Sequence, residues 1–237
     1  MWMPDEPDVF GKASFFLVDP LDEKGITGTR TRFTTQKQDE SMIYIPSLRR
    51  TRVLASSDTQ DPVGPYETYT WDDWGGQWIK PDISEFEYKK LDDAIILTSM
   101  GRHYDFYIDE TKKTGGCVFY TDWELRPVWV LEVRNKTGRY QYGRRLLFID
   151  KEWLTPRYAE MTDKRGNLYK TYNEYRKYDP RTGFYTWAHS PIYDFVNKRS
   201  TAGVMGYFTL DHPILEDPAV KPLHFNINFL KDFKGRG

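Results

Sequence analysis

Apolar and polar residues alternate along much of the chain, whereas the 3.6-residue period of an amphipathic helix is scarce. The alternation predicts strands over residues 13–18, 29–35, 42–46, 85–91, 104–108, 126–134, 139–150, 158–162, 168–178 and 204–210. Short turn sequences with glycine, NKTG at 135–138 and DKRGN at 163–167, join neighbouring segments. Such turns connect adjacent strands as hairpins, so residues 124–186 are predicted to form an antiparallel meander.

Helices have little support in the sequence. Residues 122–125 suit a single turn, and residues 190–197 open with Ser-Pro, which favours a helix N-terminus. From about residue 211 the chain is Pro-rich and irregular, with a weak last strand at 224–230. A length of 237 residues fits one large β-domain. We therefore predict a single curved antiparallel sheet domain over 1–210 and an extended Pro-rich C-terminal tail over 211–237.

The faces of the predicted strands differ in polarity. Trp129, Leu131 and Val133 alternate with their neighbours and form one apolar face of the segment 126–134. The later segment 168–178 is amphipathic on both sides. A sheet that changes from apolar to polar in this way is either half of a sandwich or a curved sheet around a cavity. An exposed apolar face needs a covering element or a ligand.

Composition excludes several classes of protein. Lys and Arg number 34 against 35 Asp and Glu, a net charge of -1, so the chain lacks the basic excess of a nucleic-acid-binding protein. Cys117 is the single cysteine, which rules out a disulfide within the chain. The start, MWMPDEPDVF, lacks the basic and apolar segments of a signal peptide, and no run approaches the roughly 18 apolar residues of a membrane helix.

No motif of catalysis or of metal binding stands out. The four histidines, at 103, 189, 212 and 224, lie far apart, and the chain has neither CxxC nor HExxH. It also lacks the G-x-S-x-G nucleophile elbow and a Gly-rich phosphate loop followed by a helix. The paired aspartates are best explained as solvated loop residues. We therefore expect a protein that is not an enzyme and that needs no cofactor and no metal.

Three tryptophans cluster in TWDDWGGQW, at positions 71, 74 and 78. Exposed Trp side chains stack on sugars or pack on apolar ligands, and Gly75-Gly76 allows close approach of the backbone. The structural alternative, in which these side chains plug one end of the sheet, is favoured over a ligand site.

A block rich in arginine precedes this cluster. It reads YIPSLRRTR at 44–52, continues with SSD at 56–58 and ends with YTWDD at 69–73. Its charged residues are Arg49, Arg50, Arg52, Asp58, Asp72 and Asp73. The nearby acids can neutralise the arginines, and Arg50 and Arg52 share one face if the strand continues past Pro46. A structural β-corner is favoured over direct headgroup binding.

A second block reads RPVWVLE at 126–132, YGRR at 142–145 and DKRGNLY at 163–169. The two blocks together, over about residues 41–178, resemble the outer-membrane lipoprotein-sorting-like proteins of the domain-of-unknown-function family 1329, in the LolA/LolB-like superfamily. The second block is similar to the C-terminal portion of that family.

The resemblance implies a mostly β fold in which a long curved antiparallel sheet, with one or two short helices, forms an incomplete barrel round an apolar cavity. It also implies a place in the periplasm or at the outer membrane of Gram-negative bacteria, where such proteins are often encoded near exporters of the resistance-nodulation-division (RND) type. Family precursors carry a signal sequence and a longer N-terminal half, so the chain is interpreted as a trimmed form.

We therefore expect a non-enzymatic binding or carrier module for a lipid or lipoprotein acyl chain that works with a membrane transport system. A scaffolding subunit of an envelope complex is the first alternative, because the Pro-rich tail could dock a partner, and a carbohydrate-binding module is the second. The expected ligand-binding residues are Trp71, Trp74, Trp78, Trp129, Leu131, Val133 and Tyr142.

Overall fold

A computed structural model of the protein describes residues 6–19, 21–34, 37, 39–54, 60, 62–63, 66–70, 72–73, 85–100, 122–179, 183–204 and 219–232. The contacts divide the chain into two compact units. The first combines residues 1–59 with 214–237, and the second holds residues 60–213. The fold is mostly β, as predicted, with antiparallel sheets in both units, and the described strands do not close into a barrel.

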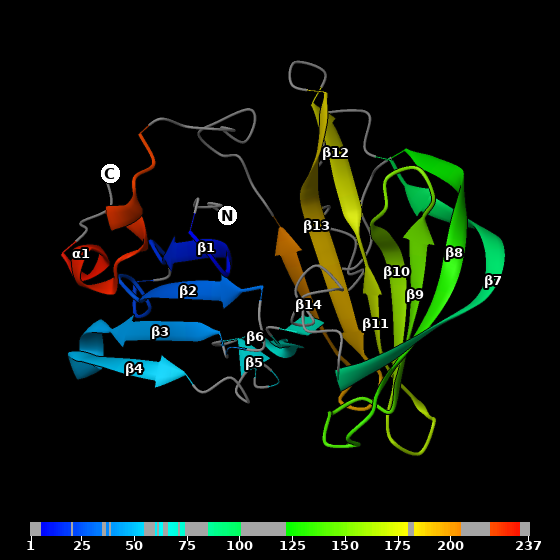
Figure 1. Cartoon of the computed structure of the whole chain (residues 1–237), viewed down its shortest axis with the longest axis horizontal. Coiled ribbons are helices and arrows are strands. Elements are labelled where there is room, and N and C mark those ends of the chain that lie inside the picture. Colours follow the sequence, from blue (N-terminus) through cyan, green and yellow to red (C-terminus); the bar gives the residue numbers. More distant parts are fainter. Residues whose placement is uncertain are drawn as a thin grey trace. The chain divides into compact units, whose positions relative to one another are not determined.

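The first unit is built on a four-stranded antiparallel meander in the order β1-β2-β3-β4 (Figure 1). Its strands are β1 Val9–Phe16, β2 Thr27–Phe33, β3 Glu40–Ile45 and β4 Arg50–Leu54. A 3-10 turn, η1 Pro46–Leu48, interrupts the chain between β3 and β4. Because Arg49 then adopts a left-handed φ of 49°, the chain reverses and Arg50 pairs with Ile45. The strand therefore does not continue past Pro46.

The C-terminal segment completes the first unit. The 3-10 turn η5 Pro222–Phe225 leads into the helix α1 Ile227–Lys231, which contacts β2 and β3. Asn226 caps this helix by accepting a hydrogen bond from the Asn228 backbone N–H at 2.8 Å, and Ile227 and Leu230 are buried. The predicted strand at 224–230 is therefore wrong. Residues 219–232, which the sequence placed in an extended tail, are instead compact.

The second unit contains an eight-stranded antiparallel sheet in the order β12-β13-β11-β10-β9-β8-β7, with β14 paired to β13. Its strands are β7 Phe86–Ser99, β8 Trp123–Asn135, β9 Arg144–Asp150, β10 Pro156–Thr162, β11 Leu168–Asn173, β12 Tyr175–Asp179, β13 Phe184–Asp194 and β14 Arg199–Val204. A short hairpin, β5 Pro62–Val63 and β6 Tyr66–Thr70, contacts β13 and β14.

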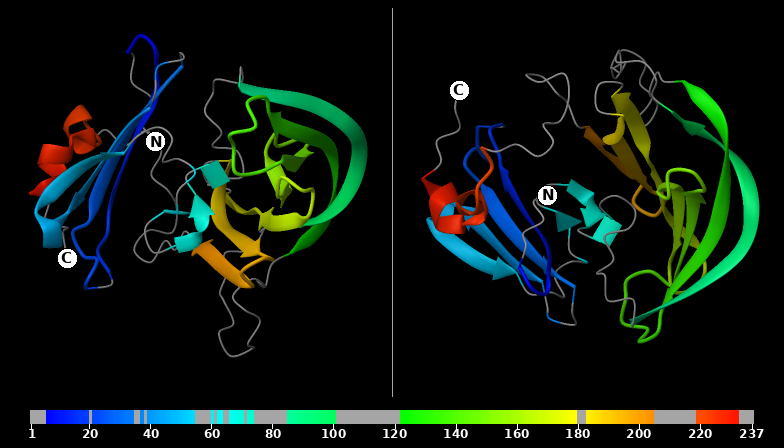
Figure 2. Two further views of the ribbon diagram at one scale, coloured as in Figure 1. Left: turned by 90° about the horizontal axis from the view of Figure 1, so that it is seen from below. Right: turned by 45° about the horizontal axis from the view of Figure 1, so that its top comes forward.

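This sheet is strongly curved, and the long strands β7 and β8 sweep round the shorter ones (Figure 2). A register shift between Lys90 and Asp92 bends β7. The edge strands β7 and β12 contact each other, and the Trp123 ring of β8 meets the Tyr175 ring of β12 edge-on, with centroids 6.0 Å apart. The sheet thus forms an incomplete barrel, as predicted.

Both predicted short helices of this unit are wrong. Residues 123–125 belong to β8, where they pair with the end of β7. Residues 190–194 belong to β13, and ladders on both sides hold them, so tertiary pairing overrides the local Ser-Pro signal. The chain turns only after Asp194, whose Oδ1 accepts hydrogen bonds from the N–H groups of Val196 and Asn197. The predicted strand at 104–108 lies outside the described residues, as does most of that at 204–210.

One face of the curved sheet carries the core. Leu131, Leu147, Ala159, Tyr172 and Ile192 stand opposite one another in successive strands, so their side chains share a face. Leu147, Ala159, Tyr172 and Ile192 belong to one packed apolar cluster, which Tyr69 of the β5–β6 hairpin also joins and against which Leu131 packs. We call this side of the sheet the inner face.

Candidate functional site

A buried cluster of charges lies on the inner face. Asp73, whose side chain is fully buried, accepts a hydrogen bond from the Tyr142 hydroxyl at 2.7 Å. The Arg145 guanidinium lies 3.3 Å and the Lys170 ammonium 3.5 Å from its carboxylate. The Thr70 backbone N–H also donates to it. Donors from β6, from the β8–β9 connection, from β9 and from β11 thus converge on one carboxylate.

The neighbouring Asp72 extends the cluster. Its Oδ2 accepts from the Tyr140 hydroxyl at 2.9 Å, and that hydroxyl accepts from Arg145 at 2.6 Å. Arg145 also donates to the Asp72 backbone carbonyl at 3.1 Å and stacks over the Tyr142 ring. We call Asp72, Asp73, Tyr140, Tyr142, Arg145 and Lys170 the polar lock.

The electrostatics of the polar lock indicate a structural role. Burial raises the pKa values of Tyr140 and Tyr142 well above the usual range, so both hydroxyls stay protonated. Burial alone would lower the pKa of Arg145, but attraction to its negative neighbours, Asp73 among them, outweighs it and the pKa is raised. Two carboxylates face two cations, so the cluster neutralises itself and ties Asp72 and Asp73 to the sheet.

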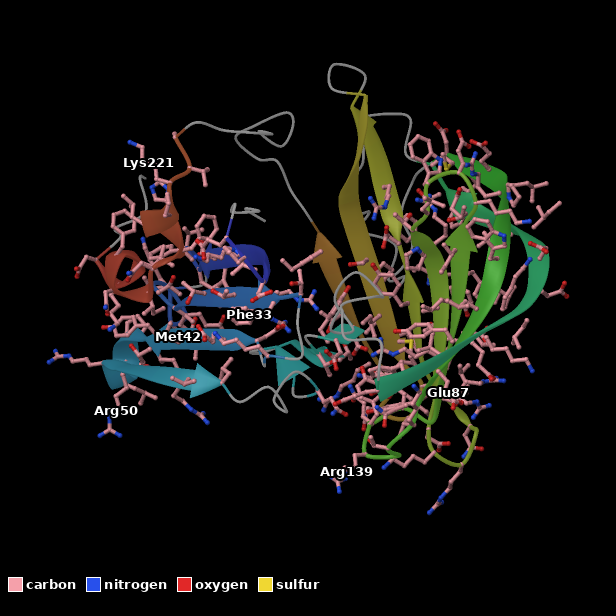
Figure 3. All side chains as sticks on the ribbon, viewed as in Figure 1. Phe33, Met42, Arg50, Glu87, Arg139 and Lys221 are labelled. Atoms are coloured by element: carbon pink, nitrogen blue, oxygen red, sulfur yellow. The ribbon has the colours of Figure 1, made fainter. Side chains whose placement is uncertain are left out.

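The predicted charged block therefore separates into parts with different surroundings. Asp72 and Asp73 are buried in the polar lock of the second unit, so the explanation of this pair as solvated loop residues is wrong. Arg49, Arg50 and Arg52 lie in the first unit, at the β3–β4 turn and on β4, and are exposed. Figure 3 shows the Arg50 side chain pointing away from its strand. Asp58 lies outside the described residues.

The predicted ligand residues of β8 lie on the inner face. Val133 is buried in the packed cluster and Leu131 packs against it, while Trp129 is half-buried. Tyr142 is buried as well, with its hydroxyl on Asp73. Trp71, Trp74 and Trp78 lie outside the described residues. The ligand role of all seven, and the carbohydrate alternative that depends on the last three, stay predictions.

Beyond Asp93, which stands opposite Trp129, the inner face is apolar and open. In β8 the side chains two, four and six residues before Trp129 share its face, and they stand opposite Ile95, Leu97 and Ser99 of β7. Ile95 is 70% exposed, Leu97 60% and Leu125 66%. Contiguous exposure of large apolar side chains marks a binding surface. We call this surface the apolar wall, made of Ile95, Leu97, Trp123, Leu125 and Pro127.

A cavity of about 230 Å³ adjoins the apolar wall. Its lining includes Leu97, Ser99, Trp123, Arg157, Glu174 and Tyr175. Glu174 is almost fully buried, and its carboxylate accepts hydrogen bonds from the Tyr172 hydroxyl at 3.0 Å and from Arg176 Nε. Burial raises the pKa of Glu174, although Arg176 opposes this shift. The cavity therefore combines apolar side walls with two buried ionisable groups.

Sequence reasoning missed Arg145, Arg157, Lys170 and Glu174. The available signal was their position in the alternation of the strand. Each lies two residues from a side chain of the packed cluster, in the same strand or at its end, and therefore points to the same face. A charge at an inward position of a strand is either paired or functional.

Neither a metal cluster nor a membrane helix is found among the described residues. They do not bring together three or more His, Cys, Asp or Glu side chains able to hold a metal ion. Nor do they include a helix that is long and apolar enough to cross a membrane.

Comparison with known proteins gives a consistent picture. A family model described as "Protein of unknown function (DUF1329)" matches residues 3–209. No match was found among curated proteins. A solved outer membrane lipoprotein-sorting protein domain from Vibrio parahaemolyticus is similar at a TM-score of 0.63 and 18% identity, covering 94% of this chain and 78% of that one.

Two further structures resemble the chain. A DUF1329 family protein from Desulfovibrio piger has a TM-score of 0.58 and 15% identity, covering 92% of this chain and 75% of that one. The LolA superfamily protein NE2245 from Nitrosomonas europaea has a TM-score of 0.47 and 14% identity, covering 81% of this chain and 68% of that one. At these identities the first two similarities establish a shared fold.

Proposed function

This chain belongs to the DUF1329 family, and we propose that it is a non-enzymatic carrier that binds the acyl chain of a lipid or lipoprotein on its inner face. The observation that carries the proposal is the apolar wall. Its large side chains are exposed, yet they continue the same face as the buried core. Covering such a surface with an acyl chain contributes about 0.8 kcal/mol for each buried methylene.

The two ends of the inner face have different roles in this proposal. The polar lock neutralises itself and fixes the β5–β6 segment to the sheet, so it offers an acyl chain nothing. The apolar wall offers a surface that suits a hydrocarbon chain. The adjoining cavity adds polar groups, among them Ser99, Arg157 and Glu174, beside Leu97 and Trp123. The cavity, at about 230 Å³, is smaller than the roughly 300–1,000 Å³ of most small-molecule sites. It would thus hold one end of a lipid while the rest lies along the wall.

The similar solved structure described as an outer membrane lipoprotein-sorting protein domain supports the carrier proposal. By this analogy we propose a location in the periplasm or at the periphery of the outer membrane of a Gram-negative bacterium. There it would pass its ligand to or from a membrane transport system, such as an exporter of the RND type.

Binding of monolaurin, an uncharged single-chain lipid, tests the carrier proposal. The purified protein should bind it below its aggregation concentration, as measured by isothermal titration calorimetry. Ile95→Asp and Leu125→Asp should each weaken binding at least tenfold, because a charge on the wall cancels the roughly 1.5–3 kcal/mol of a covered aliphatic side chain.

Val53→Asp is the matched control, since Val53 is 75% exposed and lies in the first unit. It should leave monolaurin binding unchanged. If the protein binds no monolaurin, or if Ile95→Asp and Leu125→Asp bind it like the wild type, the apolar wall is not an acyl-chain site.

A further inference from the structure

One arginine of the second unit has an unusual environment. Arg157, at the start of β10, is 1% exposed and lines the cavity beside the apolar wall. Its Nη2 donates to the Ser99 backbone carbonyl and lies 3.6 Å from Met100 Sδ. Its buried Nε has no hydrogen-bond partner, and within the described part of the chain no carboxylate lies within 4 Å of the guanidinium.

The other deeply buried arginines are paired with a carboxylate. Arg145 lies 3.3 Å from Asp73, Arg126 2.9 Å from Asp150 and Arg30 2.8 Å from Asp39. Burial lowers the pKa of Arg157, and attraction to the more distant Glu174 and Asp150 only partly offsets this. A buried cation without a partner carries a large desolvation penalty. An anion that entered the cavity would remove that penalty.

Glu174 does not serve as this anion. Although it lines the same cavity, its two oxygens already accept from Arg176 and from the Tyr172 hydroxyl. Its ion pair is with Arg176, whose Nε is its donor. The Nε of Arg157 thus remains available to a ligand at the place where the apolar wall meets the cavity.

We propose that Arg157 receives the anionic end of a single-chain amphiphile, with a carboxylate or phosphate oxygen on the guanidinium and the hydrocarbon chain along the apolar wall. This inference rests on the proposed carrier function and adds the chemistry of the ligand's polar end. Arginine suits this task because its planar guanidinium binds a carboxylate or phosphate through two N–H groups at once.

The test compares two ligands that share one chain, laurate and monolaurin, by isothermal titration calorimetry. The wild type should bind laurate about tenfold to a hundredfold more tightly, because a hydrogen bond to a charged group contributes that much to affinity. Arg157→Met should abolish this preference while retaining monolaurin binding. Arg157→Lys should keep part of it, since it keeps the charge without the planar fork.

Arg139→Met removes the same charge from an exposed loop residue of the second unit (Figure 3). It is the matched control and should keep the full preference for laurate. Acetate and inorganic phosphate, the same anions without a chain, should not displace laurate at equal concentration. Displacement by either would show that the site holds a free anion and would overturn the amphiphile assignment.

The wild-type comparison decides the matter even if Arg157→Met fails to fold. Equal affinity for laurate and monolaurin overturns the role of Arg157 and leaves the carrier function standing. A preference for laurate that persists in Arg157→Met also overturns the role of Arg157. Failure to bind either ligand overturns the carrier function, and the inference with it.

Discussion

Replacement of Asp73 by asparagine tests whether the polar lock holds the second unit together. The substitution keeps the size of the side chain and one oxygen that can accept from the Tyr142 hydroxyl, but it removes the charge. Arg145 and Lys170 are then two buried cations that have lost their shared carboxylate, at 3.3 and 3.5 Å. Removing one partner of a buried ion pair destabilises a protein by about 3–5 kcal/mol.

For a unit of this size, residues 60–213, 1 kcal/mol corresponds to about 2–4 °C in melting temperature, so Asp73→Asn should lower it by roughly 6–20 °C. Urea unfolding followed by circular dichroism gives the free energy of unfolding directly. Asp92→Asn is the control, because Asp92 is exposed on β7 and asparagine keeps the oxygen that accepts from the Asp93 backbone N–H at 2.8 Å. It should change stability by less than about 0.5 kcal/mol.

A loss of less than about 1 kcal/mol in Asp73→Asn would contradict a stabilising role of the polar lock. That result would mean that Asp72 alone neutralises both cations, or that water reaches them and screens their charge. A large loss in Asp92→Asn would equally remove the contrast on which the interpretation depends.

Two further substitutions test other parts of the second unit. Burial raises the folded-state pKa of Glu174 above 4.5, so Glu174 binds a proton more readily in the folded than in the unfolded protein. Stability should therefore fall as pH rises from 4.5 through the raised pKa. Glu174→Gln should remove this slope, so urea midpoints of wild type and variant should diverge as pH rises; parallel curves would contradict a raised pKa. Gly143→Ala should destabilise by about 1–3 kcal/mol, because its Cβ would lie 2.4 Å from the Asp163 carbonyl oxygen. An unchanged melting temperature would show that this turn yields easily.

The strands of the sheet were predictable because their signal is local. A period of two in 126–134 and in 158–162 identifies a strand whatever its neighbours, and the structure places β8 and β10 there. The errors came where tertiary pairing outweighs a local signal. Residues 190–194 carry a helix-start sequence, yet two neighbouring strands hold them in β13.

The site was harder to predict because its contacts are distant in the sequence. Asp73 meets Arg145 and Lys170 across 72 and 97 positions, and no spacing rule connects residues so far apart. The sequence did show an apolar face on β8. It did not show which end of that face would be open, since this depends on where β6 packs against the sheet.

A buried arginine has opposite consequences for anion binding at two places on the inner face, in the polar lock (Arg145) and in the cavity (Arg157). At the polar lock an incoming anion would have to displace Asp73 from Arg145, and Asp73 is held in place by four donors. At Arg157 no carboxylate of the described residues needs to be displaced, and the penalty of the buried charge is already present in the empty protein. Binding an anion there relieves a cost of folding. A laurate affinity that depends on Arg157 and not on Arg139 would therefore show that relief of this desolvation penalty drives binding.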